Sequence, residues 1–131
     1  MSKCSIIAKL RLDRHYAHIM KHGSKIVCRE FILLSAAVGS AECFTNICND
    51  TTDEPSRYYG VIASKKVGNA VKRNRAKRLL RIAAIKLCKE LECKKRVALI
   101  FIARTCTAYS SIADIQSRIK FCKNTLEHRY S

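Results

Sequence analysis

The residues of this sequence best suited to chemistry are a run of basic side chains, VKRNRAKRLLR, from Val71 to Arg81. Six of the ten residues from Lys72 to Arg81 are Lys or Arg, and none is acidic. Like charges at helical spacing repel one another, so the run adds nothing to the stability of an isolated helix. Guanidinium groups donate paired hydrogen bonds to phosphate oxygens. The run therefore indicates a surface that binds a phosphate-bearing polymer.

The excess positive charge of the chain is concentrated around this run. The 131 residues include 26 Lys and Arg against 10 Asp and Glu, a formal net charge of +16. Eleven of the basic residues and none of the acidic ones lie between Arg57 and Lys89. Charge of this size predicts a polyanionic partner, and alone it does not separate a nucleic acid from an anionic membrane surface. A merely solvated helix face would interleave Glu or Asp, so nucleic acid is the favoured partner.

The run has the periodicity of a helix with one apolar side. At about 100° per residue, that side is formed by Ala76, Leu79, Leu80, Ala83, Leu87 and Leu91. Asn69 is a suitable N-cap, so the helix is expected to run from there to about Leu91. Packing of the apolar side on a sheet would leave the basic side chains outside. Lys72 points toward the apolar sector, so it must extend away from it or lie at the helix end.

The other segments predict the sheet and two further helices of a single domain covering residues 1–131. Residues 12–22 predict a short amphipathic helix that ends at Gly23. Strands are predicted at 26–38, whose first part around 25–28 could pair separately, from Tyr58 onward, and at 95–104, which suits burial on both faces. A last helix follows Ser110 or Ser111, with an inward stripe of Ile112, Ile115, Ile119, Cys122 and Leu126. The polar segment 39–57 is interpreted as a long connection that tolerated insertion.

Several classes of function are disfavoured by what the sequence contains. The eight cysteines have no C-x-x-C spacing and follow no secretory signal, which indicates reduced structural thiols in a cytoplasmic protein. No apolar run approaches the roughly 20 residues that span a bilayer, so no membrane partner is expected. Neither a paired carboxylate nor a nucleophile motif accompanies the histidines, so surface or packing roles are expected for His15, His18, His22 and His128. No Asp/Glu cluster suits a two-metal nuclease.

The stretch SKKVGNAVKRNRAKRLLR, from Ser64 to Arg81, closely resembles the signature of the protein subunit of bacterial ribonuclease P. Its RNR motif would be Arg73-Asn74-Arg75. The resemblance continues in order through KHG at 21–23, REF at 29–31, the ALIFIAR strand and the closing helix, so it covers almost the whole chain. It implies an α+β fold: a two-layer α/β sandwich of order αβββαβα, similar to a ribosomal protein. The basic helix would lie in a left-handed βαβ crossover, against the usual right-handed rule.

The resemblance also implies a function and a set of contacts. Such a protein binds the ribonuclease P RNA and the 5′ leader of precursor tRNA, while the RNA catalyses Mg²⁺-dependent removal of the leader. Mg²⁺ would enter through the RNA, with none bound tightly by the protein and no stable protein partner implied. The RNA-binding residues carried over are Lys65, Lys66, Lys72, Arg73, Asn74, Arg75, Lys77, Arg78 and Arg81.

A second surface implied by the resemblance is a cleft between the first helix and the sheet, which would hold the leader. Tyr16 matches an aromatic position of that cleft and could stack on a base. Packing in the core beside Ile19 explains an aromatic residue at this position equally well. Met20 and Leu34 stand where other members often carry aromatics, so apolar contact would replace stacking there. His15 and His18 could add polar contacts.

Two other functions remain open on the sequence alone. One is a structural RNA-binding module of the same fold, such as a ribosomal or assembly protein. The other is a protein-only nuclease, which the missing acidic cluster disfavours. The RNR stretch and the preceding SKK-x-GNA favour the subunit of a ribonucleoprotein enzyme.

Overall fold

The computed structural model describes residues 7–10, 13–37, 57–92 and 96–130 of the chain. Five strands form one sheet: β1 (Ile7–Lys9), β2 (Ser24–Val27), β3 (Phe31–Ala37), β4 (Arg57–Ile62) and β5 (Val97–Ala103). The helices are α1 (Asp13–His22), α2 (Ala70–Glu90) and α3 (Ile112–Tyr130), with short 3-10 turns η2 (Lys65–Val67) and η3 (Thr107–Tyr109). Apart from Arg57, the connection predicted at 39–57 lies outside the described residues.

The strands are arranged in the order β1-β4-β5-β3-β2. β4 is parallel to both of its neighbours, β1 and β5, whereas β5, β3 and β2 pair antiparallel. The chain passes from β4 to the adjacent parallel strand β5 through α2, which is the expected crossover around the basic helix. The left-handed sense of that crossover stays a prediction.

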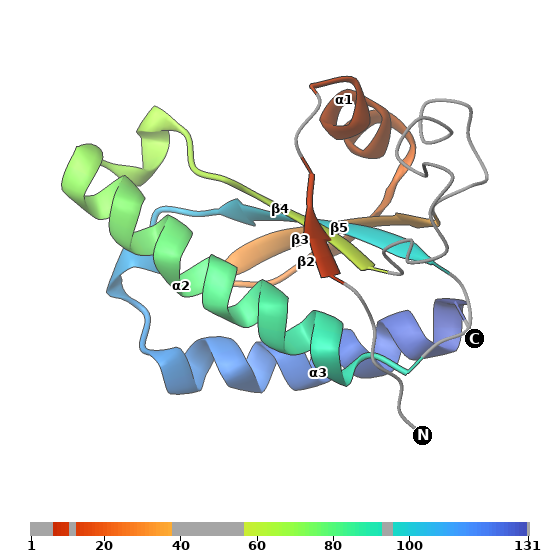
Figure 1. Cartoon of the computed structure of the whole chain (residues 1–131). Helices are drawn as coiled ribbons and strands as arrows, with labels where there is room; N and C mark the ends of the chain where they lie inside the picture. The colour runs from red at the N-terminus through yellow and green to blue at the C-terminus, as the bar shows by residue number, and fades with distance from the viewer. Residues whose placement is uncertain (1–6, 11–12, 38–56, 93–95, 131) are drawn as a thin grey trace.

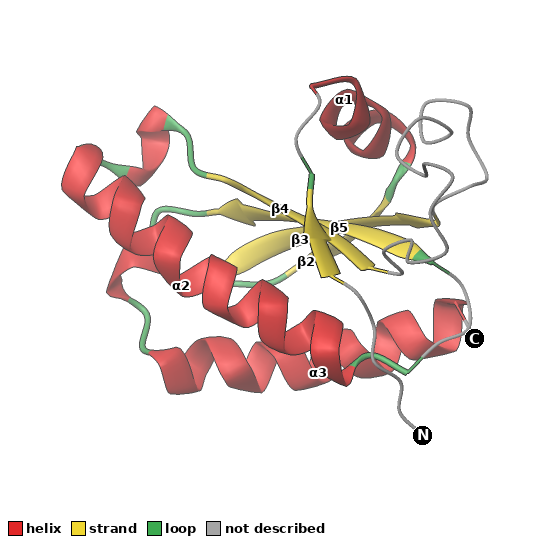
Figure 2. Cartoon of the chain, in the orientation of Figure 1, coloured by secondary structure: helices red, strands yellow, loops and turns green. Residues whose placement is uncertain are grey.

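The helices cover both faces of the sheet, and each face has its own core. Figure 1 places α2 and α3 together on one face and α1 on the other, with the strands between them, as Figure 2 also shows. The α2/α3 core includes Leu80, Phe101 and Ile119, whereas the core beneath α1 includes Ile19 and Ile100. β5 contributes to both because successive strand residues point to opposite faces. The mixed α+β fold is therefore confirmed, with α2 and α3 as the helical layer of the sandwich.

Two local details differ from the sequence expectation, and one alternative that the sequence left open is resolved. β1 was not predicted, because its three residues gain their order from pairing with β4, far away in the chain. The separate pairing considered for the first part of the strand predicted at 26–38 is confirmed: β2 and β3 are joined by a turn in which Cys28 N donates to Phe31 O at 2.9 Å. The inward position predicted for Ile112 is wrong, since the side chain is 48% exposed at the first residue of α3.

The start of α3 confirms the alternative cap, Ser111. Asp114 N donates to Ser111 Oγ at 3.1 Å, and Ser111 N donates to the Asp114 carboxylate at 3.4 Å. These reciprocal bonds satisfy two amide groups that a helix start leaves unpaired. The buried stripe of α3 then follows the prediction from Ile115 onward.

The cysteines Cys28, Cys88 and Cys122 are free and buried, as expected for thiols that act as small apolar side chains. Burial raises the pKa of the Cys88 thiol from 9.0 to about 12, against a small opposing effect of Arg57. The unfolded chain therefore releases this proton at lower pH than the folded chain does. The free energy of unfolding is expected to fall as the pH rises above about 9, by up to about 1.4 kcal/mol per pH unit for this thiol.

This alkaline loss is measured by urea unfolding at pH 8 and pH 10 on the wild-type chain and Cys88→Ala. The variant is expected to be less stable at pH 8, because a small cavity replaces the thiol. It should lose less stability between the two pH values than the wild-type chain. Parallel losses in the two proteins would show that Cys88 does not contribute to the pH dependence.

Candidate nucleic-acid interface

The basic helix expected from the sequence is α2, and it begins at the predicted cap. Asn69 Oδ1 accepts a hydrogen bond from Lys72 N at 3.0 Å, which satisfies one unpaired amide of the first turn. Gly68 leads into the helix with φ of 143°, a backbone conformation that favours glycine. The buried side agrees with the predicted periodicity and consists of Ala76, Leu79, Leu80, Ala83, Ala84, Leu87 and Cys88. The sheet therefore fixes which side of α2 faces outward.

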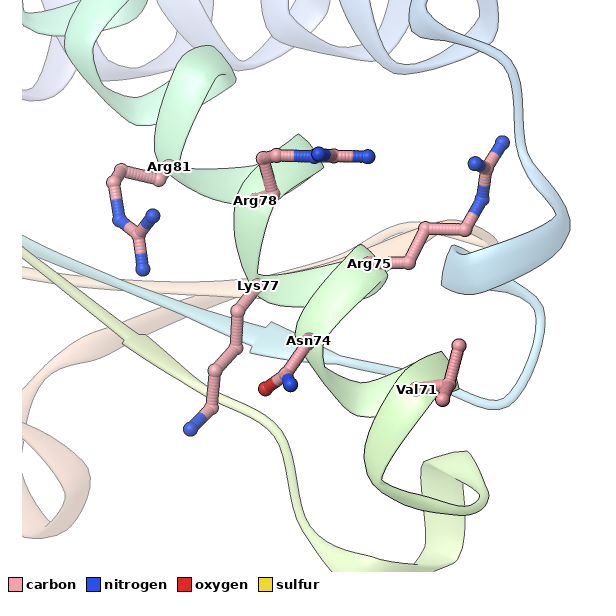
Figure 3. Close-up of a pocket in the computed structure, with 6 residues that line it drawn as sticks. All are labelled: Val71, Asn74, Arg75, Lys77, Arg78 and Arg81. Atoms are coloured by element: carbon pink, nitrogen blue, oxygen red, sulfur yellow. The ribbon is translucent and has the colours of Figure 1, made fainter.

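The outward side of α2 carries a group of polar and basic residues that we call the cationic face: Asn74, Arg75, Lys77, Arg78 and Arg81. Together with Val71 they line a shallow hollow of about 500 Å³, and Figure 3 shows their side chains projecting from the helix. Ion pairs in the described part of the chain join Lys86 to Glu90, Arg118 to Glu30 and Lys123 to Glu127. Within that part no carboxylate pairs with the cationic face, so its charge is available to an external anion.

Arg75 and Lys72 connect this helix to η3. Arg75 Nε donates to Ala108 O at 2.8 Å, and Figure 3 shows the side chain reaching toward that segment. Lys72 lies in the first turn of α2, where its Nζ is 5.1 Å from the centroid of the Tyr109 ring. Of the two positions expected for Lys72, the one at the helix end is confirmed.

The remaining basic residues of the predicted RNA-binding set differ in exposure. Lys65 and Lys66 are exposed on η2, which precedes α2 and is held by buried Val67. Arg73 is half-buried, and its Nε is buried with no hydrogen-bond partner among the described residues. Arg73 is thus less exposed than Arg75, Arg78 and Arg81, in contrast to the fan of basic residues predicted from the sequence.

The residues predicted to line a leader cleft lie on α1 and β3, and Tyr16 on α1 is the one whose contacts are best defined. The half-buried ring lies against Gly60 of β4, where an added Cβ would be only 2.5–2.7 Å from Tyr16 ring and hydroxyl atoms. The hydroxyl donates to Leu10 O at 3.3 Å. Burial, with smaller effects of Tyr59 and Asp13, raises the pKa of Tyr16. The missing side chain of Gly60 therefore provides the position in which the ring lies.

The other two predicted cleft residues have opposite environments. Met20 is 53% exposed and available for contact. Leu34 is only 4% exposed and belongs to the core beneath α1, so it supports the cleft from within and presents little surface to a ligand. The hairpin register turns Leu34 toward α1, and the helix covers it.

A row of partly exposed apolar residues on the same face of the sheet was missed by the sequence reasoning. Ile62 pairs with Ile102, Ile102 with Ile32, and Ile32 with Val27, so the row crosses four strands. The three isoleucines pack against the core beneath α1, while Val27 is 59% exposed. Because side chains alternate between the two faces of a strand, the sequences 26–38 and 95–104 could have shown which residues share a face within each segment. Only the pairing of the strands brings these residues together in one row.

The histidines of α1 differ in burial, and no metal-holding group of side chains occurs in the described part of the chain. His15 is 2% exposed, so it does not line the cleft, whereas His18 and His22 lie on α1 with ring centroids 4.9 Å apart. No group of three or more His, Cys, Asp or Glu side chains that could hold a metal occurs among residues 7–10, 13–37, 57–92 and 96–130. Over the same ranges, no helix has the length and apolarity needed to cross a membrane.

Comparison with known proteins gives consistent matches. The family model described as Ribonuclease P matches residues 7–127. A ribonuclease P protein component of Clostridium botulinum is 30% identical over 111 residues, which are 85% of this chain and 86% of the relative. A Caulobacter vibrioides protein of the same name is 36% identical over 93 residues, 70% of this chain but 62% of the relative's length.

Solved structures resemble the chain in fold. The Staphylococcus aureus RNase P protein superimposes with a TM-score of 0.63 at 23% identity, covering 86% of this chain and 89% of that one. For the Thermotoga maritima RNase P protein the TM-score is 0.60 at 18% identity, with 94% and 97% covered. At these identities the likeness concerns the arrangement of the sheet and helices.

Proposed function

Because the chain belongs to the family of ribonuclease P protein components, we propose that it is the protein subunit of a ribonuclease P ribonucleoprotein. In this proposal the chain binds the RNA subunit and the 5′ leader of precursor tRNA, and the complex removes the leader by endonucleolytic cleavage. It acts in the cytoplasm as one RNA-binding domain over residues 1–131 and needs no stable protein partner.

The cationic face of α2 is the observation that carries the proposal. Its guanidinium groups lie outside, without carboxylate partners among the described residues, on a helix that the sheet holds in place. Such groups bind phosphates with paired hydrogen bonds and release counterions from the polymer. We assign RNA contact to this face and its neighbours: Lys65, Lys66, Lys72, Arg73, Asn74, Arg75, Lys77, Arg78 and Arg81.

The cleft beside α1 is proposed to hold the leader of precursor tRNA. The half-buried ring of Tyr16 suits stacking on one base, and exposed Met20 offers apolar contact. Ile32, Ile62 and Ile102 would form the floor, in place of the buried Leu34. A single aromatic ring over an aliphatic floor suits single-stranded RNA of variable sequence, because any base can stack on the ring.

The hydrolysis itself is assigned to the RNA subunit with Mg²⁺. Basic side chains repel a divalent cation, and the cationic face offers only the Asn74 amide as a neutral side-chain oxygen donor. The residues present there do not fit a metal site. The chain's contribution is positive charge that lowers repulsion between two polyanions, together with a site that positions the leader.

Reconstitution tests the proposal directly. Cleavage of precursor tRNA by the RNA subunit at low Mg²⁺ is measured with and without this chain, and the chain is expected to accelerate it strongly because it replaces part of the cation requirement. Cleavage by the chain without RNA would instead indicate a protein-only nuclease. RNA binding without acceleration would indicate a structural RNA-binding module, the second candidate.

A further inference from the structure

Tyr109 is an exposed aromatic ring that none of the sites above uses. It is 70% exposed, and among the Tyr and Phe rings of the described ranges only Phe121 on α3, at 57%, is comparably open. Leaving a large ring in water forgoes the free energy that burial would supply. The ring's surroundings therefore indicate what covers it.

Those surroundings belong to the start of the cationic face. Lys72 Nζ lies 5.1 Å from the ring centroid, and Arg75 Nε donates to the carbonyl of Ala108, the residue before Tyr109. Val71, 75% exposed, lies one residue before Lys72 and lines the same hollow as Arg75. Lys72 thus lies over the exposed ring, and Arg75 holds the backbone of the preceding residue to the helix that presents the arginines.

The backbone that carries the ring is firmly held. Thr107 and Ala108 are buried, Arg104 N donates to Thr107 Oγ1 at 2.8 Å, and that hydroxyl donates to the Glu30 carbonyl. Tyr109 N donates to Cys106 O at 3.1 Å. The ring is therefore presented from a fixed turn, so little conformational entropy is lost when a ligand covers it.

We propose that Tyr109 stacks on an unpaired base of the RNA that the cationic face binds, with Lys72 and Arg75 contacting the phosphates beside that base. A flat ring next to cations suits a nucleotide because the base has a π-face and the phosphate a negative charge. Bases inside a duplex are already stacked on both sides, so the site selects an unpaired one. The inference rests on the proposed function and adds a second kind of contact to it.

Fluorescence provides a specific test, because the chain contains no tryptophan. Tyr109→Trp introduces a single indole at the site, and its emission is expected to be quenched when the ribonuclease P RNA binds. Polyphosphate, which has the charge but no bases, should leave the emission nearly unchanged. Phe121→Trp is the matched control. Position 121 is exposed on α3 and lies roughly 14 Å along that helix from Ile112, its first residue, so its indole should respond little to RNA.

Binding affinity provides an independent test. Tyr109→Leu is expected to weaken RNA binding by about five- to 150-fold, the range for loss of one base–aromatic stack. Tyr109→Phe keeps the ring and should bind within about twofold of the wild-type chain. Thermal unfolding of both variants shows whether the loss comes from misfolding, and the Tyr109→Trp experiment does not depend on that outcome.

The possible failures are distinguishable. If the wild-type chain binds RNA but Tyr109→Trp is not quenched, or Tyr109→Leu binds normally, the stacking inference is overturned and the proposed function stands. Quenching by polyphosphate equal to that by RNA also overturns stacking, because charge alone would then explain it. If the wild-type chain does not bind RNA, both ideas are overturned.

Discussion

Replacing Arg78 or Arg81 with alanine is expected to weaken binding of the ribonuclease P RNA by about 1–3 kcal/mol each. Both side chains are exposed on the cationic face, with no carboxylate partner among the described residues. Their removal therefore takes away an external contact and leaves the packing of α2 unchanged. The two residues lie one turn apart and share a hollow, so the double variant need not show the sum of the single losses.

Salt dependence separates a phosphate contact from a general loss of charge. The slope of log affinity against log salt should decrease by about 1 for each phosphate contact removed. Lys120→Ala is the matched control, because Lys120 is exposed and carries the same charge on another helix, α3. Equal losses in Lys120→Ala and Arg78→Ala would mean that net charge, not the cationic face, drives binding.

Arg73 is a poorer probe than its place in the RNR motif suggests. The motif puts Arg73, Asn74 and Arg75 together in sequence, but a helix turns each by about 100° from the last. Asn74 and Arg75 lie outside, while Arg73 is half-buried with an Nε that lacks a described partner. Alanine at 73 would change the packing around this half-buried side chain as well as any RNA contact, so its effect on binding has two causes.

The parts of the site that sequence reasoning located are those set by local pattern. The spacing of Leu80, Ala83 and Leu87 predicts which side of α2 is buried, and Asn69 predicts where the helix begins. Both features depend on residues within a few turns of each other, and both are confirmed. The cationic side then follows by exclusion, since a helix anchored on one side presents the other to solvent.

The parts that could not be predicted depend on contacts between distant segments. Alternation shows that Leu34 and Ile32 share one face of β3, but not that α1 covers the first and leaves the second partly open. The approach of Lys72 and Arg75 to η3 joins residues more than thirty positions apart. No periodicity encodes such pairs, because they follow from how α2 and η3 pack on the same sheet.

Gly60 is a feature that the sequence could have predicted only in part. An isolated glycine in a strand pattern signals the close approach of another group without naming it. The structure identifies that group as the Tyr16 ring, whose nearest atoms would be 2.5–2.7 Å from an added Cβ. The sequence could therefore have marked β4 as a site of close packing, and only the fold connects that site to Tyr16.

Gly60→Ala is accordingly expected to displace the Tyr16 ring and to lower the free energy of unfolding by about 1–3 kcal/mol, the usual cost of overpacking. The loss should depend on the ring. Gly68 is the only glycine with positive φ in the described ranges, so alanine at position 60 meets no backbone strain of that kind. In a Tyr16→Ala background the clash is gone, and Gly60→Ala should become neutral or stabilise by up to about 1 kcal/mol, because alanine restricts the unfolded chain.

Urea unfolding of the four proteins in this double-mutant cycle measures the coupling. Tyr16→Phe serves as a further background: it removes only the hydroxyl oxygen at 2.5 Å and leaves Cε1 and Cζ at 2.7 Å, so relief should be partial. An equal loss from Gly60→Ala in every background would show that the clash lies elsewhere. In the reconstituted complex, Gly60→Ala should weaken binding of precursor tRNA with a leader but not of the same tRNA without one. Displacing the ring would remove a contact that the proposed function assigns to the leader alone.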